Sequence, residues 1–345
     1  MPADPSADGP GRQRGRSAPL LAVRGLRTSF FTRDGEVKAV DNVDLTLRRG
    51  QTLGLVGESG CGKSVTSLSI MRLVRPPGRI IGGQVLFDGV DLASVPEPEM
   101  RKVRGGRISM IFQEPMTSLN PVLTCGFQIA EVIREHQHLA GAALHARVIE
   151  VLRSVGIPQP DRRYHAYPHE LSGGMRQRIV IAMAIACDPD VLIADEPTTA
   201  LDVTIQAQIL ALLKAQRERR GMALLLITHD LGVIAEMADD VAVMYAGEIV
   251  EFADVMTLFR SPRHPYTIGL LNSLPTLTTQ RTQPLHAIPG TVPNLLRLPS
   301  GCRFAPRCSR VMAICQEVPP VLRPIDDGRL VSCHLYDPIA SPVVG

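Results

Sequence analysis

A glycine-rich loop set between an apolar strand and a helix is the feature that most constrains the fold. Residues 57–64 read Gly-Glu-Ser-Gly-Cys-Gly-Lys-Ser and fit the phosphate-loop pattern GxxxxGK[ST]. The run 52–56 before the loop has the composition of a buried strand, and residues 65–73 after it are typical of a helix. A chance glycine-rich turn is the alternative, and the flanking strand and helix argue against it.

The residue types of this loop suit it to phosphate. Glycines allow backbone N–H groups to close around phosphate oxygens, and the helix N-terminus adds positive potential. Lys63 can reach the β- and γ-phosphates of a nucleotide, and the Ser64 hydroxyl can ligate Mg²⁺. The loop therefore predicts a nucleoside triphosphatase without saying which one. The residues expected to contact the nucleotide here are Gly57, Ser59, Gly60, Cys61, Gly62, Lys63 and Ser64.

Strand-like and helix-like segments alternate along much of the chain. The β-type runs 191–194, 224–228 and 241–245 are separated by the helical patterns 204–219 and 231–237. This alternation predicts a mostly parallel sheet with helices on its faces. A long helical insertion, the helical subdomain at about residues 115–187, precedes the first of these strands. After residue 260 prolines become frequent and periodicity fades, so we place a domain boundary near Ser261.

The composition excludes several classes of protein. A hydrophobic fraction of 45% and a charged fraction of 21% are ordinary for a globular protein, and the net charge of +3 is too small to argue for a nucleic-acid partner. The apolar runs are far shorter than the roughly 20 residues that a membrane helix needs. Residues 1–18 lack the apolar core of a secretory signal and have the composition of a disordered tail. We expect a cytosolic protein that does not span a bilayer by itself.

Two carboxylates follow the apolar run 191–194. Asp195, at the end of the expected strand, can hold Mg²⁺ through water, and Glu196 can orient or deprotonate an attacking water. A solvated acidic turn is common after strands and is the alternative for this pair alone. Because a phosphate loop is also present, we interpret Asp195 as a metal ligand and Glu196 as the catalytic base.

Residues 171–178 read Leu-Ser-Gly-Gly-Met-Arg-Gln-Arg. Ser172, Gly173 and Gly174 are suited to a phosphate, since two glycines permit close approach, a hydroxyl donates and a helix begins just after them. A helix N-cap on Ser172 is the alternative, and both can hold. The run resembles the signature of the ATP-binding cassette (ABC) proteins, in which it caps the nucleotide held by a partner subunit. The resemblance extends over about residues 20–260, with the motifs in family order.

The ABC resemblance implies roles for further residues. Gln113 resembles the glutamine that ligates Mg²⁺ and senses the membrane partner. A lone histidine after a strand is more often structural. His229, however, resembles the switch histidine that contacts the γ-phosphate. Asp202 lies in a run similar to the D-loop, which crosses the dimer seam. Adenine would stack on Phe30, with Phe31 as the neighbouring alternative and core packing as the alternative for both rings.

The C-terminal part carries a second resemblance. Residues 261–267 read Ser-Pro-Arg-His-Pro-Tyr-Thr and are similar to the His-Pro-Tyr element that opens the C-terminal extension of oligopeptide/dipeptide importer ATPases. The segments 288–293, 301–308 and 331–335 continue the likeness. The resemblance implies an α/β P-loop ABC nucleotide-binding domain over residues 19–260, with a mixed sheet and a helical subdomain, and a Pro/Cys-rich extension over 261–345.

Four cysteines gather in the extension at Cys302, Cys308, Cys315 and Cys333. Four thiolates can complete a tetrahedral zinc site or a four-iron cluster. The spacing is wider than the CxxC pairs that zinc sites favour, which suits the larger cluster; zinc, disulfides and free thiols are the alternatives. Members of the resembled importer family with this cysteine set carry a [4Fe-4S] cluster, so the resemblance implies one here.

The combined resemblance implies an ATP-hydrolysing subunit that energises uptake of di- and oligopeptides at the cytoplasmic face of the cell membrane. Its implied partners are a second, paralogous ABC ATPase, two transmembrane permease subunits and an extracytoplasmic peptide-binding protein. Another cargo (nickel, an opine or an oligosaccharide) is one alternative. A soluble ABC ATPase acting on DNA or ribosomes and a cluster-binding regulator are two others. The absence of a second cassette argues against the former, and intact Glu196 and His229 argue against the latter.

Overall fold

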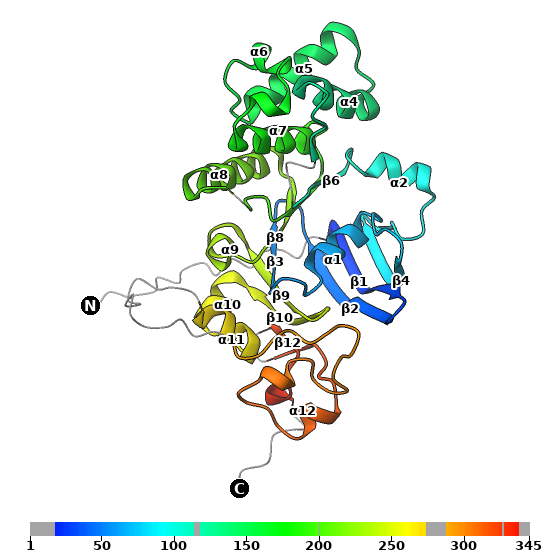
Figure 1. Ribbon diagram of the computed structural model, residues 1–345, viewed down its shortest axis with the longest axis vertical. Helices are drawn as coiled ribbons and strands as arrows, with labels where there is room; N and C mark the ends of the chain where they lie inside the picture. The colour runs from blue at the N-terminus through cyan, green and yellow to red at the C-terminus, as the bar shows by residue number, and fades with distance from the viewer. Residues whose placement is uncertain (1–17, 114–117, 200, 274–287, 326–327, 338–345) are drawn as a thin grey trace, which may run out of the picture.

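The computed structural model describes residues 18–113, 118–199, 201–273, 288–325 and 328–337. The tail expected over residues 1–18 therefore lies outside the described residues except for its last member. Two sheets and a group of helices make up the described part (Figure 1). In this part of the chain, no helix is both long enough and apolar enough to cross a bilayer.

Parallel strands form the centre of the larger sheet, which has the order β11-β12-β10-β9-β3-β8-β7-β6. The strand before the phosphate loop, β3, is flanked by β8 and β9, so the loop lies near the middle of the sheet. All residues of β3, β7 and β8 are buried, which explains their unbroken apolar sequences. The predicted α/β fold is confirmed. The parallel strands are β3 (Thr52–Val56), β6 (Ile108–Ile111), β7 (Val191–Asp195), β8 (Ala223–Thr228) and β9 (Asp240–Tyr245).

The smaller sheet is antiparallel and has the order β2-β1-β4-β5. Its first two strands are much longer than the short strands that apolar residues near 22–23 and 43–47 indicate. Charged residues such as Arg24, Arg27 and Lys38 occupy positions along them, and this weakens the apolar signal without breaking the strand. The strands are β1 (Leu21–Thr32), β2 (Gly35–Leu47), β4 (Gly78–Phe87) and β5 (Val90–Asp91), followed by helix α2 (Glu97–Val103).

A helical subdomain stands at one end of the molecule (Figure 1). Its helices pack together through fully buried side chains, which include Ile129, Ile133, Val148 and Leu152. These residues belong to the same apolar core as β7 and β8, so the subdomain is packed onto the sheet. Its elements are α4 (Cys125–Gln137), α5 (Gly141–Ser154), α6 (Pro160–Tyr164), η1 (Pro168–Glu170) and α7 (Gly173–Ile185). The helices beside the sheet are α1 (Lys63–Ile70), α8 (Val203–Arg220), α9 (Leu231–Met237) and α10 (Val255–Arg260).

The C-terminal extension continues the larger sheet. Strand β12 pairs with β10, placing Val331 opposite Glu251. Tyr266 and Phe304 pack on Tyr245 of β9, with ring centroids 4.6 and 5.2 Å apart, so the extension shares the core of the nucleotide-binding part. The elements here are β10 (Glu248–Asp254), α11 (Pro265–Asn272), η2 (Ala305–Arg307), α12 (Ile314–Glu317), β11 (Arg323–Pro324), β12 (Leu330–Val331) and η3 (His334–Tyr336).

Candidate functional site

The phosphate loop requires glycine at two positions where its backbone lies very close to backbone atoms of neighbouring strands. Gly57 has φ +155°, and a Cβ there would lie 2.2 Å from the Met244 carbonyl oxygen. Gly62, at φ +111°, would place a Cβ 2.2 Å from the Ala39 carbonyl oxygen. These contacts hold the loop between β9 and β2, with its exposed part at Ser59 and Gly60 facing outward. The loop is therefore a fixed cradle and not a freely moving turn.

The side chains at the end of the loop meet the carboxylate of β7. Lys63 is 5% exposed, and its Nζ donates to the carbonyl oxygens of Gly57 at 2.8 Å and Glu58 at 3.0 Å. The Ser64 hydroxyl donates to Asp195 Oδ1 at 3.1 Å. Burial raises the pKa of Asp195 to about 6, against the opposing hydrogen bond from Ser64. A divalent cation at this point would favour the ionised carboxylate, which makes the pair a fitting Mg²⁺ donor set.

Glu196 is held by a network from three different segments. Its Oε2 accepts from Gln113 Nε2 at 3.2 Å and from the Thr199 hydroxyl at 2.9 Å, while Oε1 lies 3.2 Å from His229 Nδ1. Burial would raise the pKa of Glu196, but the bonds from His229 and Thr199 outweigh it, and the pKa is lowered. An ionised carboxylate beside the phosphate loop suits the role of a base. The structure thus brings together Gln113, Glu196 and His229, which are far apart in sequence.

The backbone at Glu196 adopts φ +47°, a left-handed conformation at a non-glycine residue. Its N–H donates to the Ile227 carbonyl at 2.8 Å, which ties the end of β7 to β8. A strained position fixed by a neighbouring strand is typical of catalytic residues. Neither this strain nor the contact from Thr199 is predicted by the sequence motifs.

The signature residues lie at the start of α7. Ser172 is exposed and caps the helix, since its Oγ accepts from the Met175 N–H at 3.3 Å. Gly173 has open space where a Cβ would project, and Gly174 packs against Ile205. In Figure 1, α7 stands with the helical subdomain and apart from α1 of the phosphate loop. Ser172 is therefore an exposed residue at the N-terminus of a helix in the helical subdomain.

One further contact connects the signature region to the segment that follows β7, and a second caps the neighbouring helix α8. Buried Gln177 of α7 donates through Nε2 to the Pro197 carbonyl at 2.5 Å, directly after Glu196. Asp202 caps α8 by accepting from the Ile205 N–H at 2.9 Å. The link through Gln177 was not foreseen from the sequence, because a single glutamine in an apolar helix carries little signal.

The two candidate adenine-stacking rings have different surroundings. Phe30 is half-buried, and a Cβ on Gly78 would meet its ring at 2.7 Å, so that glycine leaves room for the ring. Phe31 is 45% exposed, with the Arg79 guanidinium 5.8 Å from its ring centroid. Phe31 is thus the more available ring, while the assignment of Phe30 stays a prediction.

The four cysteines of the extension lie near one another as free thiols. Burial is the main cause that raises the pKa values of Cys302 and Cys333 to about 11, and the charges of neighbouring cysteines contribute to the same shift. The Arg310 N–H donates to Cys308 Sγ at 3.3 Å, and backbone N–H groups also reach the sulfurs of Cys302 and Cys333. N–H···S bonds of this kind accompany thiolates that bind metal. Among the described residues, however, no three His, Cys, Asp or Glu side chains are arranged to hold one metal ion.

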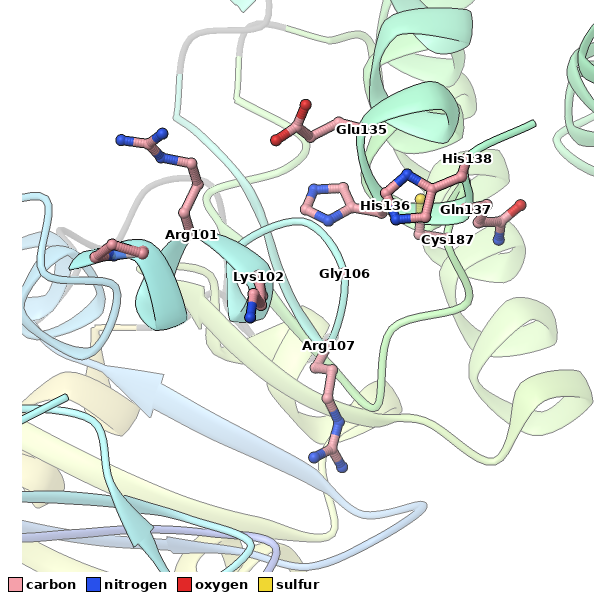
Figure 2. Close-up of a pocket in the computed structure, with 10 residues that line it drawn as sticks. Arg101, Lys102, Gly106, Arg107, Glu135, His136, Gln137, His138 and Cys187 are labelled. Atoms are coloured by element: carbon pink, nitrogen blue, oxygen red, sulfur yellow. The ribbon is translucent and has the colours of Figure 1, made fainter. Parts of the chain in front are cut away.

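A separate cleft of about 540 Å³ lies between α2 and the C-terminal end of α4, where Figure 2 shows Arg101, Lys102 and His136 around it. Arg107 lines it just before β6, at the opposite end of that strand from Gln113. Lys102 is paired with Glu99, and Arg107 with Asp88 and Asp190. The cleft is therefore no part of the nucleotide site, and most of its positive charge is already neutralised.

Comparison with known families gives two matches. The model described as "ABC transporter" matches residues 40–199. The model described as "Oligopeptide/dipeptide transporter, C-terminal region" matches residues 250–315. The first range contains the phosphate loop, Gln113, the signature and the acidic pair, and the second contains the His-Pro-Tyr element and three of the four cysteines.

Relatives and solved structures agree with these matches. The chain is 52% identical over 325 residues to the oligopeptide transport ATP-binding protein OppD of Bacillus subtilis, covering 94% of this chain and 91% of OppD. It is 50% identical over 326 residues to the dipeptide transport ATP-binding protein DppD of the same organism, covering 94% and 97%. The dimeric structure of MJ0796, a bacterial ABC transporter cassette, superimposes with a TM-score of 0.61 at 27% identity, covering 68% of this chain and 99% of that one. A post-hydrolysis MJ0796 dimer bound to ADP and Pi gives a TM-score of 0.62 at 26% identity, with the same coverage.

Proposed function

Because this chain belongs to the ABC transporter ATP-binding proteins that carry the oligopeptide/dipeptide C-terminal region, we propose that it is the ATP-hydrolysing subunit of an importer for di- and oligopeptides. The observation that carries this proposal is the likeness to peptide transport ATPases over 94% of the chain, extension included. A nucleotide-binding part alone would support ATP hydrolysis but would leave the cargo class open.

The catalytic roles follow from the contacts of the site. Lys63 holds the β- and γ-phosphates once it exchanges the carbonyls of Gly57 and Glu58 for phosphate oxygens. Ser64 and Asp195, with Gln113, would hold Mg²⁺, which neutralises phosphate charge when bound. Glu196 orients and deprotonates the attacking water, and His229, which lies against the same carboxylate, reports on the γ-phosphate.

The second half of the site is supplied by another cassette. The exposed Ser172, Gly173 and Gly174 at the N-terminus of α7 grip the γ-phosphate held by a partner, and Asp202 lies at the seam between them. ATP binding closes the pair, and hydrolysis removes the bridge and opens it. The free energy of closure shifts attached membrane subunits between two states, because ATP binds the closed pair more tightly.

The assembly comprises this chain, a paralogous ATPase, two transmembrane permease subunits and an extracytoplasmic peptide-binding protein. The chain is peripheral, at the cytoplasmic face of the membrane, and docks through the surface around Gln113 and the helical subdomain. The test is reconstitution with the permeases in proteoliposomes. Peptide-loaded binding protein should stimulate ATP hydrolysis and peptide uptake. Stimulation by nickel or an oligosaccharide, but by no peptide, would reject the cargo class.

We propose further that Cys302, Cys308, Cys315 and Cys333 hold a [4Fe-4S] cluster, with zinc as the alternative. The support is chemical, since half-buried thiols that accept N–H···S bonds lie near one another in the C-terminal extension. The sulfur atoms do not surround a single ion as placed, so no step of hydrolysis is assigned to the cluster. Anaerobically purified protein should be brown, with about four irons per chain. Stoichiometric zinc without visible absorbance would reject the cluster.

A further inference from the structure

We infer that Arg307, in the C-terminal extension, is a positioning residue for the phosphate loop. It holds Glu58, the second residue of the loop, and through it sets the affinity for ATP. The inference rests on the proposed function of this loop as the ATP site. It assigns to the extension a direct part in nucleotide binding, besides any part in transport.

The contact between Arg307 and Glu58 is a two-pronged ion pair. Nη1 lies 2.6 Å from Glu58 Oε2, and Nη2 lies 3.0 Å from Oε1. The Arg307 side chain is only 4% exposed, and its Nε donates to the Pro289 carbonyl at 2.9 Å. Parallel N–H···O bonds from a buried, fixed guanidinium define the position of a carboxylate far better than a surface lysine could. Glu58 is therefore anchored in a set orientation.

The backbone of Glu58 is held on both sides as well. Its N–H donates to the Tyr266 hydroxyl at 2.8 Å, so the His-Pro-Tyr element also touches the loop. Its carbonyl oxygen accepts from Lys63 Nζ at 3.0 Å. The residue that the extension anchors is thus the same residue that orients the phosphate-binding lysine. A displaced Glu58 would change both the path of the loop and the partner of Lys63.

The segment that carries Arg307 is itself held in place by contacts with the rest of the extension and with the sheet. Arg307 ends the short helix η2, one residue before Cys308, and Cys302 donates its N–H to the Cys315 carbonyl at 2.8 Å. Arg303, four residues earlier, pairs with Asp41 of β2 and with Glu248 of β10, which fastens the same segment to the sheet. The segment between Cys302 and Cys308 is therefore attached to the sheet through Arg303 and to the phosphate loop through Arg307.

The test is equilibrium binding of a fluorescent ATP analogue to the full chain, with thermal unfolding of each variant. Arg307→Met and Glu58→Gln should each raise Kd about tenfold, and the double variant should be no weaker than either single one, because the two residues form one contact. Arg307→Lys should recover part of the affinity. At saturating ATP, kcat should stay near that of the wild type, so the defect appears in KM.

The matched control is Arg323→Met, which breaks the 3.0 Å ion pair with Asp337 inside the same extension. It should lower the unfolding temperature and leave Kd within about twofold. If Arg307→Met does not fold, Glu58→Gln, at a half-buried loop position, still decides the question. Unchanged Kd in Glu58→Gln, additive losses in the double variant, or an equal rise in Arg323→Met would overturn the inference. Lys63→Ala distinguishes a failure of this inference from a failure of the proposed function. If that variant binds ATP normally, the loop is not the ATP site.

Discussion

At the scale of single residues, the proposed role of Glu196 as the base requires its carboxylate to stay ionised. Gln113, Thr199 and His229 fix this carboxylate, and the bonds from His229 and Thr199 lower its pKa against the opposing effect of burial. We expect Glu196→Gln to lower the ATPase rate at least about 100-fold, because the base is lost while the shape is kept. The affinity for ATP should not change, since phosphate contacts come from the loop. Steady-state hydrolysis and equilibrium binding measure the two effects.

Glu236→Gln is the control for this substitution, as Glu236 is an exposed carboxylate on α9. It should hydrolyse ATP like the wild type. Normal turnover in Glu196→Gln would show that another group activates the water. A loss of ATP affinity in that variant would instead assign Glu196 to binding.

The phosphate loop offers a second residue-scale comparison in two of its glycines. Gly62→Ala forces a Cβ to within 2.2 Å of the Ala39 carbonyl oxygen, and it should destabilise the protein by more than about 2 kcal/mol and abolish ATP binding. Gly60→Ala, at φ +77° with open space around it, should cost only about 1–2 kcal/mol. Urea unfolding gives both values. Equal costs at the two sites would show that backbone strain alone, and not the collision, sets the requirement.

The sequence revealed these residues because their motifs are local. A phosphate loop, a signature and an acidic strand end each occupy a few consecutive positions, so spacing alone identifies them. The contacts of Glu58 with Tyr266 and Arg307 join segments more than 200 residues apart, 208 and 249 positions respectively, and no local pattern encodes them. Thr199 was missed for a different reason, since a threonine in a turn has many ordinary uses.

At the scale of elements, the start of α11 depends on a buried neutral histidine. His264 is 1% exposed and caps the helix, with its Nδ1 accepting from the Tyr266 N–H at 3.1 Å. Burial lowers its pKa from 6.5 to about 3. The sequence showed the His-Pro-Tyr run but could not show that its histidine is enclosed. Phe304, from a segment distant in sequence, contributes to that enclosure, with its ring centroid 5.6 Å from that of His264.

This burial predicts a loss of stability in weak acid. Below pH 6.5 the unfolded chain binds a proton at His264 while the folded chain stays neutral, so unfolding becomes easier as the pH falls from 6.5 towards 3. The slope is about 1.4 kcal/mol per pH unit. His264→Asn keeps a capping oxygen but has no proton to gain. Between pH 7 and pH 5 it should lose about 2 kcal/mol less than the wild type in urea unfolding. Equal losses in both proteins would place the histidine in a solvated state.

At the scale of the whole molecule, the two parts of the proposed catalytic pocket lie on different parts of the fold. The phosphate loop and Glu196 follow the carboxyl ends of β3 and β7, whereas Ser172 caps α7, which stands with the helical subdomain (Figure 1). In the proposed function, a second cassette supplies the signature residues that complete the site. The overlap with a dimeric ABC cassette and with a dimer bound to ADP and Pi agrees with this geometry. The extension adds strands at the far edge of the same sheet, so it leaves the helical subdomain open for partners.

The proposal that two cassettes share one catalytic site can be tested by comparing two N-cap residues that stabilise their helices in the same way. Ser172 caps α7 and Thr124 caps α4, each accepting from a backbone N–H three residues on. Replacing either by alanine should cost about 1 kcal/mol of stability. Only Ser172→Ala should lower the ATPase rate of the assembled pair, because in the proposed site only that hydroxyl contacts the partner's γ-phosphate. ATP binding to the isolated chain should be the same in both variants, since each chain holds nucleotide through its own loop. Full-rate hydrolysis by a strict monomer carrying Ser172→Ala would mean that one cassette is sufficient, and the mechanical coupling proposed for the importer would have no basis.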